Sequence, residues 1–196
     1  QLKLSQHKTR VAIMVSQYDH CLADLLHRHK SGELACEIPL VISNHRDTEA
    51  LVKFYGIDFH HIEVNKDNKS QAEAAQFKLF ADYNIDLIVL ARYMQILSPD
   101  FVSRYPQRII NIHPALLPKY GGKGMYGSHV HEAVVAAGEK ETGITIHWVD
   151  AHYDEGDIIL QKKCSIDATD TPATVAQKIH VLEHQYFAPT REELLK

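Results

Sequence analysis

Short segments that are almost wholly apolar place the strongest constraint on how this chain can fold. Three of them, at residues 10–16, 86–91 and 108–112, are rich in Val, Ile and Leu. Such runs are typical of strands that are buried on both faces of a parallel sheet. Segments with apolar residues at helical spacing lie between them, and this alternation indicates crossover units. We therefore predict an α/β domain of three layers with a mostly parallel, Rossmann-like central sheet.

The remaining elements follow from the same two patterns. Further strands are expected at residues 38–44, 59–64, 143–149 and 157–161. Helices are expected at residues 20–31, 47–55, 71–83, 99–104, 128–137 and 171 to about 186. We expect Asp19 to cap the first helix and Gly32 to end it. Residues 114–127 contain two prolines and four glycines, which predicts a loop.

Length and charge limit the class of protein. A chain of 196 residues, 45% of them hydrophobic, can bury one sizeable core. We interpret residues 1–9 as an amino-terminal extension and residues 10–196 as a single catalytic domain. The net charge of -4, with basic and acidic residues interspersed, argues against a nucleic-acid partner. No apolar run approaches the roughly 18 to 20 residues of a membrane span, so we expect no membrane partner and a cytoplasmic location.

Cysteine and histidine patterns do not indicate a metal centre. The three cysteines, Cys21, Cys36 and Cys164, have no paired spacing, so we expect reduced thiols. Three closely spaced histidine pairs invite a metal interpretation: His27/His29, His60/His61 and His129/His131. No His-Glu-x-x-His sequence accompanies them, and we predict that no metal is bound.

Candidate catalytic residues follow the strand at residues 108–112. In open parallel sheets the ligand crevice lies beyond the carboxyl ends of the strands, where Asn111 and His113 emerge. Being two apart, they share one face of an extended chain, and an amide with an imidazole suits a developing oxyanion. Asp154, in the acidic loop 150–157, could reach the same crevice and act on a water or on the histidine. Taken singly, Asn111 is better read as an ordinary turn residue, His113 as an edge histidine and Asp154 as a solvated acid, so spacing alone does not assign them a catalytic role.

Two segments resemble the signatures of the folate-dependent formyltransferase family. Residues 111–119, Asn-Ile-His-Pro-Ala-Leu-Leu-Pro-Lys, resemble the first, and Asp154 with Gly156 and the apolar residues after it resembles the second. The resemblance implies 10-formyltetrahydrofolate as substrate, tetrahydrofolate as product and no metal. It further implies that Asn111 and His113 bind and polarise the formyl oxygen. Asp154 would assist proton transfer and hold the histidine charged.

The family resemblance also implies a folate site. Residues 92–97 are similar to the family's pterin-binding edge, which offers apolar walls and backbone hydrogen-bond groups. The implied folate-binding residues are Met94, Gln95, Ile96, Leu97 and Asp150.

The two halves of the chain resemble different branches of this family. Residues 10–112 are similar to 10-formyltetrahydrofolate deformylases, whose amino-terminal ACT-type domain we expect to be absent here. Residues 113–187 are similar to glycinamide ribonucleotide transformylases, with Pro114 in place of the deformylase's second histidine. The segment Leu182-Glu183-His184 resembles the transformylase ending, in which the glutamate contacts the substrate amine. A truncated or engineered chimera would account for this division, and so would a natural intermediate.

The turn after the first strand favours water as the formyl acceptor. Phosphate binding at this position needs glycines, so that backbone amides approach closely, but residues 16–20 contain none and add the carboxylate of Asp19. The predicted function is therefore hydrolysis of 10-formyltetrahydrofolate to formate and tetrahydrofolate. Two alternatives stay open: formyl transfer to glycinamide ribonucleotide in purine biosynthesis, and a folate-binding scaffold with little turnover.

The acceptor side and the oligomeric state complete the predictions. The expected acceptor-side residues are Ser16, Tyr18, His20, His129, His131 and Glu183. His129 and His131 are equally well read as surface residues of a helix. Exposed strand edges leave a homo-oligomer open.

Overall fold

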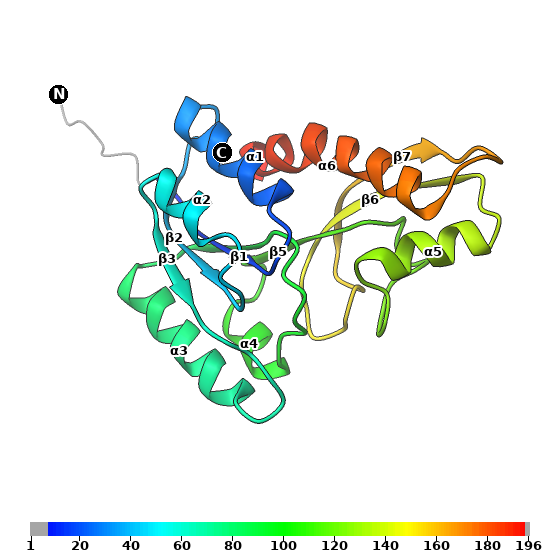
Figure 1. The fold of residues 1–196 in the computed structure, drawn as a ribbon. Helices are drawn as coiled ribbons and strands as arrows, with labels where there is room; N and C mark the ends of the chain where they lie inside the picture. The colour runs from blue at the N-terminus through cyan, green and yellow to red at the C-terminus, as the bar shows by residue number, and fades with distance from the viewer. Residues whose placement is uncertain (1–7, 195–196) are drawn as a thin grey trace.

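The chain forms an α/β domain around one seven-stranded sheet with the strand order β3-β2-β1-β4-β5-β6-β7 (Figure 1). The computed structural model describes residues 8–194, so that most of the predicted extension 1–9 lies outside the described residues. The strands are β1 Arg10–Val15, β2 Glu37–Ser43, β3 Asp58–His61, β4 Leu87–Leu90, β5 Ile109–His113, β6 Glu141–Trp148 and β7 Ile158–Ser165. Pairing is parallel from β3 through β5 and antiparallel for β6 and β7. The predicted fold class is confirmed.

Helices cover both faces of the parallel part of the sheet. They are α1 His20–Ser31, α2 Glu49–Phe54, α3 Lys69–Asp82, α4 Pro99–Arg104, α5 Ser128–Ala136 and α6 Pro172–Leu194. Helices α1 and α6 lie on one side of the central strands, and α3 and α4 lie on the other (Figure 1). None of the described helices is long and apolar enough to cross a membrane.

The strand β1 shows why the central segments are apolar throughout. Val11 and Ile13 are fully buried in the cluster that includes residues of α1 and α6. Ala12 and Met14 point the other way and are fully buried in the cluster that contains Phe80 of α3. Because alternate residues of a strand face opposite sides, a strand covered on both sides needs apolar residues at every position.

The ends of β7 and α6 differ from the predicted ones. Strand β7 continues to Ser165 because it pairs along its length with β6, although its lysines interrupt the apolar pattern. Helix α6 extends beyond the predicted end near residue 186, with Phe187 and Ala188 buried. Gly32 ends α1 in the left-handed conformation as predicted. Asp19 occupies the N-cap position of α1 as predicted, but its side chain accepts no capping hydrogen bond there.

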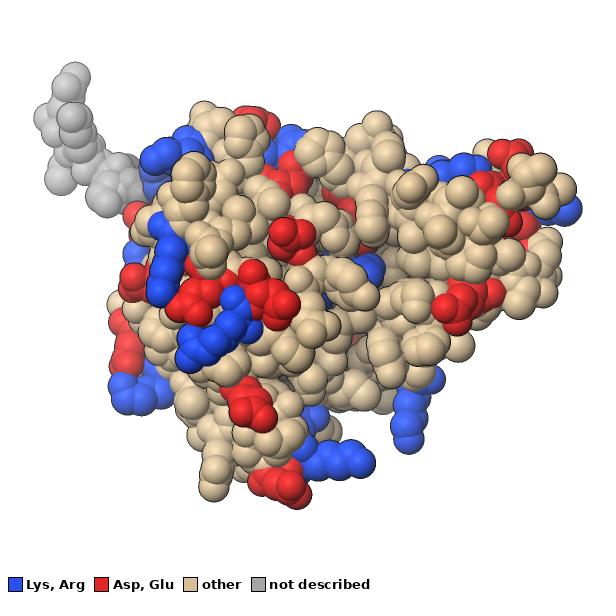
Figure 2. Space-filling view, viewed as in Figure 1, with Lys and Arg blue, Asp and Glu red and all other residues tan. Residues whose placement is uncertain are grey.

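The thiols and the surface agree with the expectations from composition. All three cysteines lie in the described residues, and no disulfide forms between them there, in agreement with the prediction of reduced thiols. On the face drawn in Figure 2, lysines and arginines lie among aspartates and glutamates and do not form a single basic stripe. The absence of a nucleic-acid partner stays a prediction, as does the homo-oligomer.

Candidate active site

Asn111 is positioned by the pairing of β5 with β6. It lies directly opposite His147 in the antiparallel register, and its Nδ2 atom is 3.2 Å from Nε2 of that ring. The Nδ1 atom of His147 lies 2.9 Å from the carbonyl oxygen of Trp148, which can only accept a hydrogen bond. Nδ1 of the neutral ring therefore carries the hydrogen, and Nε2 accepts one from Asn111. One amide hydrogen of Asn111 is held in this way, and the second is left for a ligand.

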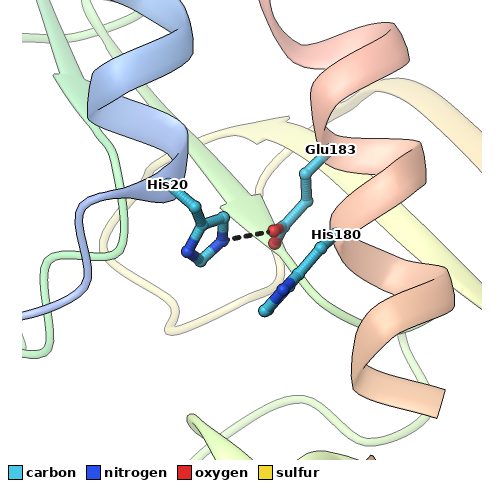
Figure 3. Close-up of side chains that lie close together, drawn as sticks. All are labelled: His20, His180 and Glu183. Atoms are coloured by element: carbon cyan, nitrogen blue, oxygen red, sulfur yellow. Dashed lines mark hydrogen bonds and ion pairs between the residues drawn. The ribbon is translucent and has the colours of Figure 1, made fainter. Parts of the chain in front are cut away.

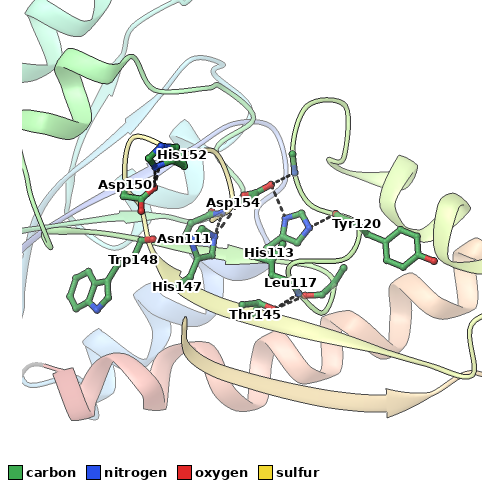
Figure 4. A network of polar contacts seen from close by, with 12 residues as sticks. Asn111, His113, Leu117, Tyr120, Thr145, His147, Trp148, Asp150, His152 and Asp154 are labelled. Carbon is green, nitrogen blue, oxygen red and sulfur yellow. Dashed lines mark hydrogen bonds and ion pairs between the residues drawn. The ribbon is translucent and has the colours of Figure 1, made fainter. Parts of the chain in front are cut away.

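His113 and Asp154 complete a cluster at the end of β5 (Figure 4). Nε2 of His113 donates to the carbonyl oxygen of Tyr120 over 2.7 Å, which leaves Nδ1 facing Oδ2 of Asp154 at 3.7 Å. The other carboxylate oxygen, Oδ1, lies 3.8 Å from Nε2 of His147. The backbone N–H of Gly122 donates to Oδ2 over 3.0 Å and so fixes the carboxylate. The structure brings the three predicted catalytic residues together and adds His147.

The loop that carries Asp154 can approach β6 because residue 156 is glycine. A Cβ atom at Gly156 would lie 1.8 Å from the carbonyl oxygen of Trp148, far inside van der Waals contact. Asp154 itself has a φ of 59°, in the left-handed region that Asp and Asn adopt more readily than most residues. The position of the carboxylate thus depends on local backbone geometry as much as on its hydrogen bond.

Burial determines the charge state of the two histidines. The side chains of His113 and Asp154 are only 5% and 3% exposed. Burial lowers the pKa of His113, and the nearby carboxylate of Asp154 opposes this effect without overcoming it. Burial also lowers the pKa of His147, against the opposing effects of its backbone hydrogen bond and of Asp154. Both rings are therefore neutral at neutral pH, which differs from the expectation that Asp154 holds His113 charged in the free protein.

A cavity with mainly apolar walls opens beside Asn111 and Asp154. Four of the five predicted folate-binding residues line it: Gln95, Ile96, Leu97 and Asp150. Met94, the fifth, instead lines a second cavity, and its backbone N–H donates to the hydroxyl of Ser16.

The second cavity also borders Asn111. Its walls include Arg92 and His113, and it shares Asn111 and Tyr153 with the first cavity. Asn111 is therefore accessible from both cavities. None of the six predicted acceptor-side residues, all of which lie in the described part of the chain, lines this second cavity.

Two predicted acceptor-side residues have clear structural roles. The Ser16 hydroxyl is buried and donates to Oδ1 of Asn44 over 2.6 Å, which ties the ends of β1 and β2 together. His129 is exposed on α5, where it lies 3.6 Å from Glu132 and packs edge-on against Tyr126. His131, two residues on, is buried, and its Nδ1 has no hydrogen-bond partner among the described residues.

His20 and Glu183 meet in a second polar cluster, together with His180 (Figure 3). Nε2 of His20 lies 2.6 Å from Oε2 of Glu183, and the two histidine rings stack with centroids 4.2 Å apart. The potential ligand atoms of the three residues lie within 4.8 Å of one another. Burial raises the pKa of Glu183, but the hydrogen bond to His20 and the charge of Arg92 outweigh it, so the carboxyl is ionised.

Arg92 connects this cluster to the second cavity. Its Nη1 atom lies 3.6 Å from Oε1 of Glu183, and its guanidinium stands over the ring of Tyr18 at 5.4 Å. The cluster therefore already contains a permanent cation beside its only carboxylate. For this reason we assign no metal to it.

Comparison with known proteins identifies the family. Residues 9–190 match the family described as formyl transferase. This chain belongs to the formyl transferase family. The predicted family resemblance is thereby confirmed.

Formyl transferases of both predicted branches are similar to this chain. It is 43% identical over 188 residues to the formyltetrahydrofolate deformylase of Synechocystis sp., covering 96% of this chain and 64% of that protein. The crystal structure of a formyltetrahydrofolate deformylase from Pseudomonas syringae pv. tomato superimposes with a TM-score of 0.90 at 35% identity, covering 97% of this chain and 62% of that one. The phosphoribosylglycinamide formyltransferase of Bacillus halodurans gives a TM-score of 0.87 at 33% identity, with 96% of each chain covered. The chain thus spans less than two thirds of these two deformylases.

Sequence reasoning missed three residues of this formyl transferase site: His147, Arg92 and His180. His147 alternates with apolar neighbours in a predicted strand, as Thr145 does, and these two polar residues on one strand face were a usable signal. Arg92 directly follows a buried strand, where site residues of such sheets gather. His180 stacks on His20, which is distant in the sequence, and the only local signal was its place one helical turn before Glu183 on α6.

Proposed function

We propose that this chain hydrolyses 10-formyltetrahydrofolate to formate and tetrahydrofolate. The observation that carries the proposal is the position of Asn111 between two cavities, with one amide hydrogen held by His147 and the other free. One cavity would hold the folate and the other the acceptor, so that the formyl group and water meet at Asn111, which both cavities share. The similarity to proteins named formyltetrahydrofolate deformylase supports the same assignment.

The folate would bind in the cavity lined by Gln95, Ile96 and Leu97. Its apolar walls suit a flat heterocycle, and the carboxylate of Asp150 suits the polar edge of a pterin. The free amide hydrogen of Asn111 then donates to the formyl oxygen. Because this donor is fixed before the reaction, it stabilises the negative charge that develops on that oxygen.

Water would be activated between His113 and Asp154. Their facing atoms are 3.7 Å apart, too long for a direct hydrogen bond, and a water molecule placed beside them can contact both. Neutral Nδ1 of His113 accepts a proton from this water as the water oxygen bonds to the formyl carbon. The imidazolium that forms is stabilised by the carboxylate of Asp154.

Breakdown of the intermediate returns the catalyst to its starting state. The bond between the formyl carbon and N10 breaks, and N10 receives the proton held by His113. The carboxylic acid product loses its own proton to solvent and leaves as formate. In this scheme His147 acts through Asn111 and is a positioning residue.

A second candidate is formyl transfer to glycinamide ribonucleotide. The similarity to the Bacillus halodurans enzyme, at nearly full coverage of both chains, favours it. Two features of this chain oppose it. The turn before α1 has no glycine with which to approach a phosphate, and Glu183 is already paired with His20 and Arg92.

The deciding experiment measures formate release from 10-formyltetrahydrofolate by the 196-residue chain, with and without glycinamide ribonucleotide. Release without the ribonucleotide supports hydrolysis. Turnover that requires the ribonucleotide would establish a transferase and refute the proposal. Folate binding without turnover under either condition would leave only the scaffold. We further propose a cytoplasmic location, because three cysteines without paired spacing suit a reducing compartment.

A further inference from the structure

Arg92 stands at an unusual place in the backbone. It follows the carboxyl end of β4 with a φ of 63°, a left-handed conformation that a long side chain rarely adopts. The N–H of Ser16 donates to its carbonyl oxygen over 3.3 Å, which ties this residue to the end of β1. The fold thus holds an arginine where glycine would be relaxed, and this conformation directs the guanidinium into the interior of the site.

The guanidinium is buried and still has an unused donor. The side chain is only 6% exposed, and Nη1 lies 3.6 Å from Oε1 of Glu183. Nε of Arg92 is buried and has no hydrogen-bond partner in the described part of the chain. A buried guanidinium with a free N–H, in the wall of a cavity that also contains His113 and Asn111, is suited to a small anion.

Arg92 also makes the second cavity unfavourable for an amine. Its positive charge repels a protonated amine, and its ion pair with Glu183 occupies the carboxylate that would otherwise attract one. The positive charge of Arg92 also affects His131: burial is the largest cause of the lowered pKa of His131, and the charge of Arg92 is the second. Each of these effects favours a neutral acceptor and an anionic product.

We propose that Arg92 is a specificity-determining residue that binds the formate product and disfavours an amine acceptor. This inference rests on the proposed hydrolysis. In that reaction the water oxygen bonds to the formyl carbon, the bond from that carbon to N10 breaks, and N10 takes the proton. Formate leaves as an anion, whereas transfer to an amine would give a neutral amide. Arg92 exchanges no proton in either case and acts through its charge and its hydrogen bonds.

The test measures binding of 13C-labelled formate by NMR, in the presence of tetrahydrofolate, and compares wild type with Arg92→Gln and Arg92→Lys. Loss of the charge in Arg92→Gln is expected to weaken formate binding by on the order of tenfold or more, whereas Arg92→Lys retains most of it. Arg104→Gln is the matched control, because Arg104 is exposed on α4, pairs with Asp100 and lies outside both cavities. Equal formate binding by wild type and Arg92→Gln, or an equal loss in Arg104→Gln, would overturn the inference.

A third variant, Arg92→Gly, tests the choice of acceptor. Glycine accommodates the observed φ, and the cavity loses its cation; urea denaturation checks that the fold is retained without the ion pair to Glu183. We expect the ratio of formylated amine to formate, measured with glycinamide ribonucleotide present, to rise by about tenfold or more over wild type. An unchanged ratio would contradict the specificity role.

Failure of this inference is distinguishable from failure of the proposed function. Wild-type hydrolysis together with formate binding that ignores Arg92 would refute the inference alone. Formate binding that depends on Arg92, in a wild type that releases no formate, would support the anion site and refute hydrolysis.

Discussion

Replacing Asp154 by Asn tests the central feature of the site, which is one buried carboxylate between two neutral histidines. Asn has nearly the same shape, tolerates the left-handed φ of 59°, and can still accept the hydrogen bond from Gly122. The substitution therefore removes the charge while it leaves the geometry in place. Any loss of activity then reports on electrostatics.

The size of the effect follows from the distances. Asp154 lies 3.7 Å from Nδ1 of His113 and 3.8 Å from Nε2 of His147. A pair of unit charges at the shorter distance is worth about 4 kcal/mol at an effective dielectric constant of about 20. This attraction arises when His113 accepts the proton from water, so it stabilises the transition state and not the free protein. Its loss corresponds to a fall in kcat of about 10³-fold.

The assay is the initial rate of formate release at saturating 10-formyltetrahydrofolate. The matched control is Glu155→Gln, which removes the same charge one residue away from an exposed side chain. Urea denaturation of each variant checks that the fold is retained. A rate for Asp154→Asn within about threefold of wild type, or an equal loss in Glu155→Gln, would refute the electrostatic role.

Three further predictions concern other parts of the fold. His147→Ala is expected to lower kcat for formate release by about 10²-fold with little change in KM, because the oxyanion donor loses its orientation; a change in KM alone would contradict this. Gly156→Ala should lower the free energy of unfolding in urea by about 3 kcal/mol, because its Cβ would meet a strand carbonyl. Gly32→Ala, which has open space around it, should cost only about 1 kcal/mol, so equal losses would refute the packing argument. Burial lowers the pKa of His131 from 6.5 to about 4. As the pH falls below 6.5, the unfolded chain therefore takes up a proton at this residue before the folded protein does, and the free energy of unfolding decreases. The free energy of unfolding from urea denaturation should fall by about 2 kcal/mol between pH 6.5 and 5 because of His131. This part of the pH dependence should be absent in His131→Gln and present in His129→Gln, and the same pH dependence in both variants would contradict the prediction.

The parallel part of the fold was predictable because burial on both faces leaves a plain signal. Strands β1, β4 and β5 are apolar at successive positions, since helices cover both sides of the sheet there. The antiparallel edge was harder to delimit. Strand β7 is half exposed, so that Lys162 and Lys163 fall within it, and its true end depends on its pairing with β6. The length of β7 depends on how far it pairs with β6, and the local apolar pattern of β7 contains no information on that pairing.

The same distinction explains which site residues could be found from the sequence. Asn111 and His113 lie two apart at the carboxyl end of one strand, so their proximity follows from strand geometry alone. His147 meets Asn111 only because β6 pairs antiparallel with β5 in one particular register. The sequence predicted neither that β6 pairs with β5 nor the register of that pairing, so the contact between His147 and Asn111 could not be predicted either. Asp154 lay beyond strand geometry as well: the acidic loop made it one candidate among several acids, and the family resemblance singled it out.

The contrast between two of the buried carboxylates, Asp154 and Glu183, indicates why only Asp154 would take part in proton transfer. Glu183 is held between His20 and the permanent cation of Arg92, which keeps it ionised throughout. Asp154 faces two neutral imidazoles, so its surroundings gain a positive charge only when one of them accepts a proton. A carboxylate whose stabilisation increases during the reaction favours the transition state over the ground state, whereas one that is already neutralised contributes equally to both. On this argument Asp154 contributes to the rate, and Glu183 contributes by keeping Arg92 in place beside the acceptor cavity.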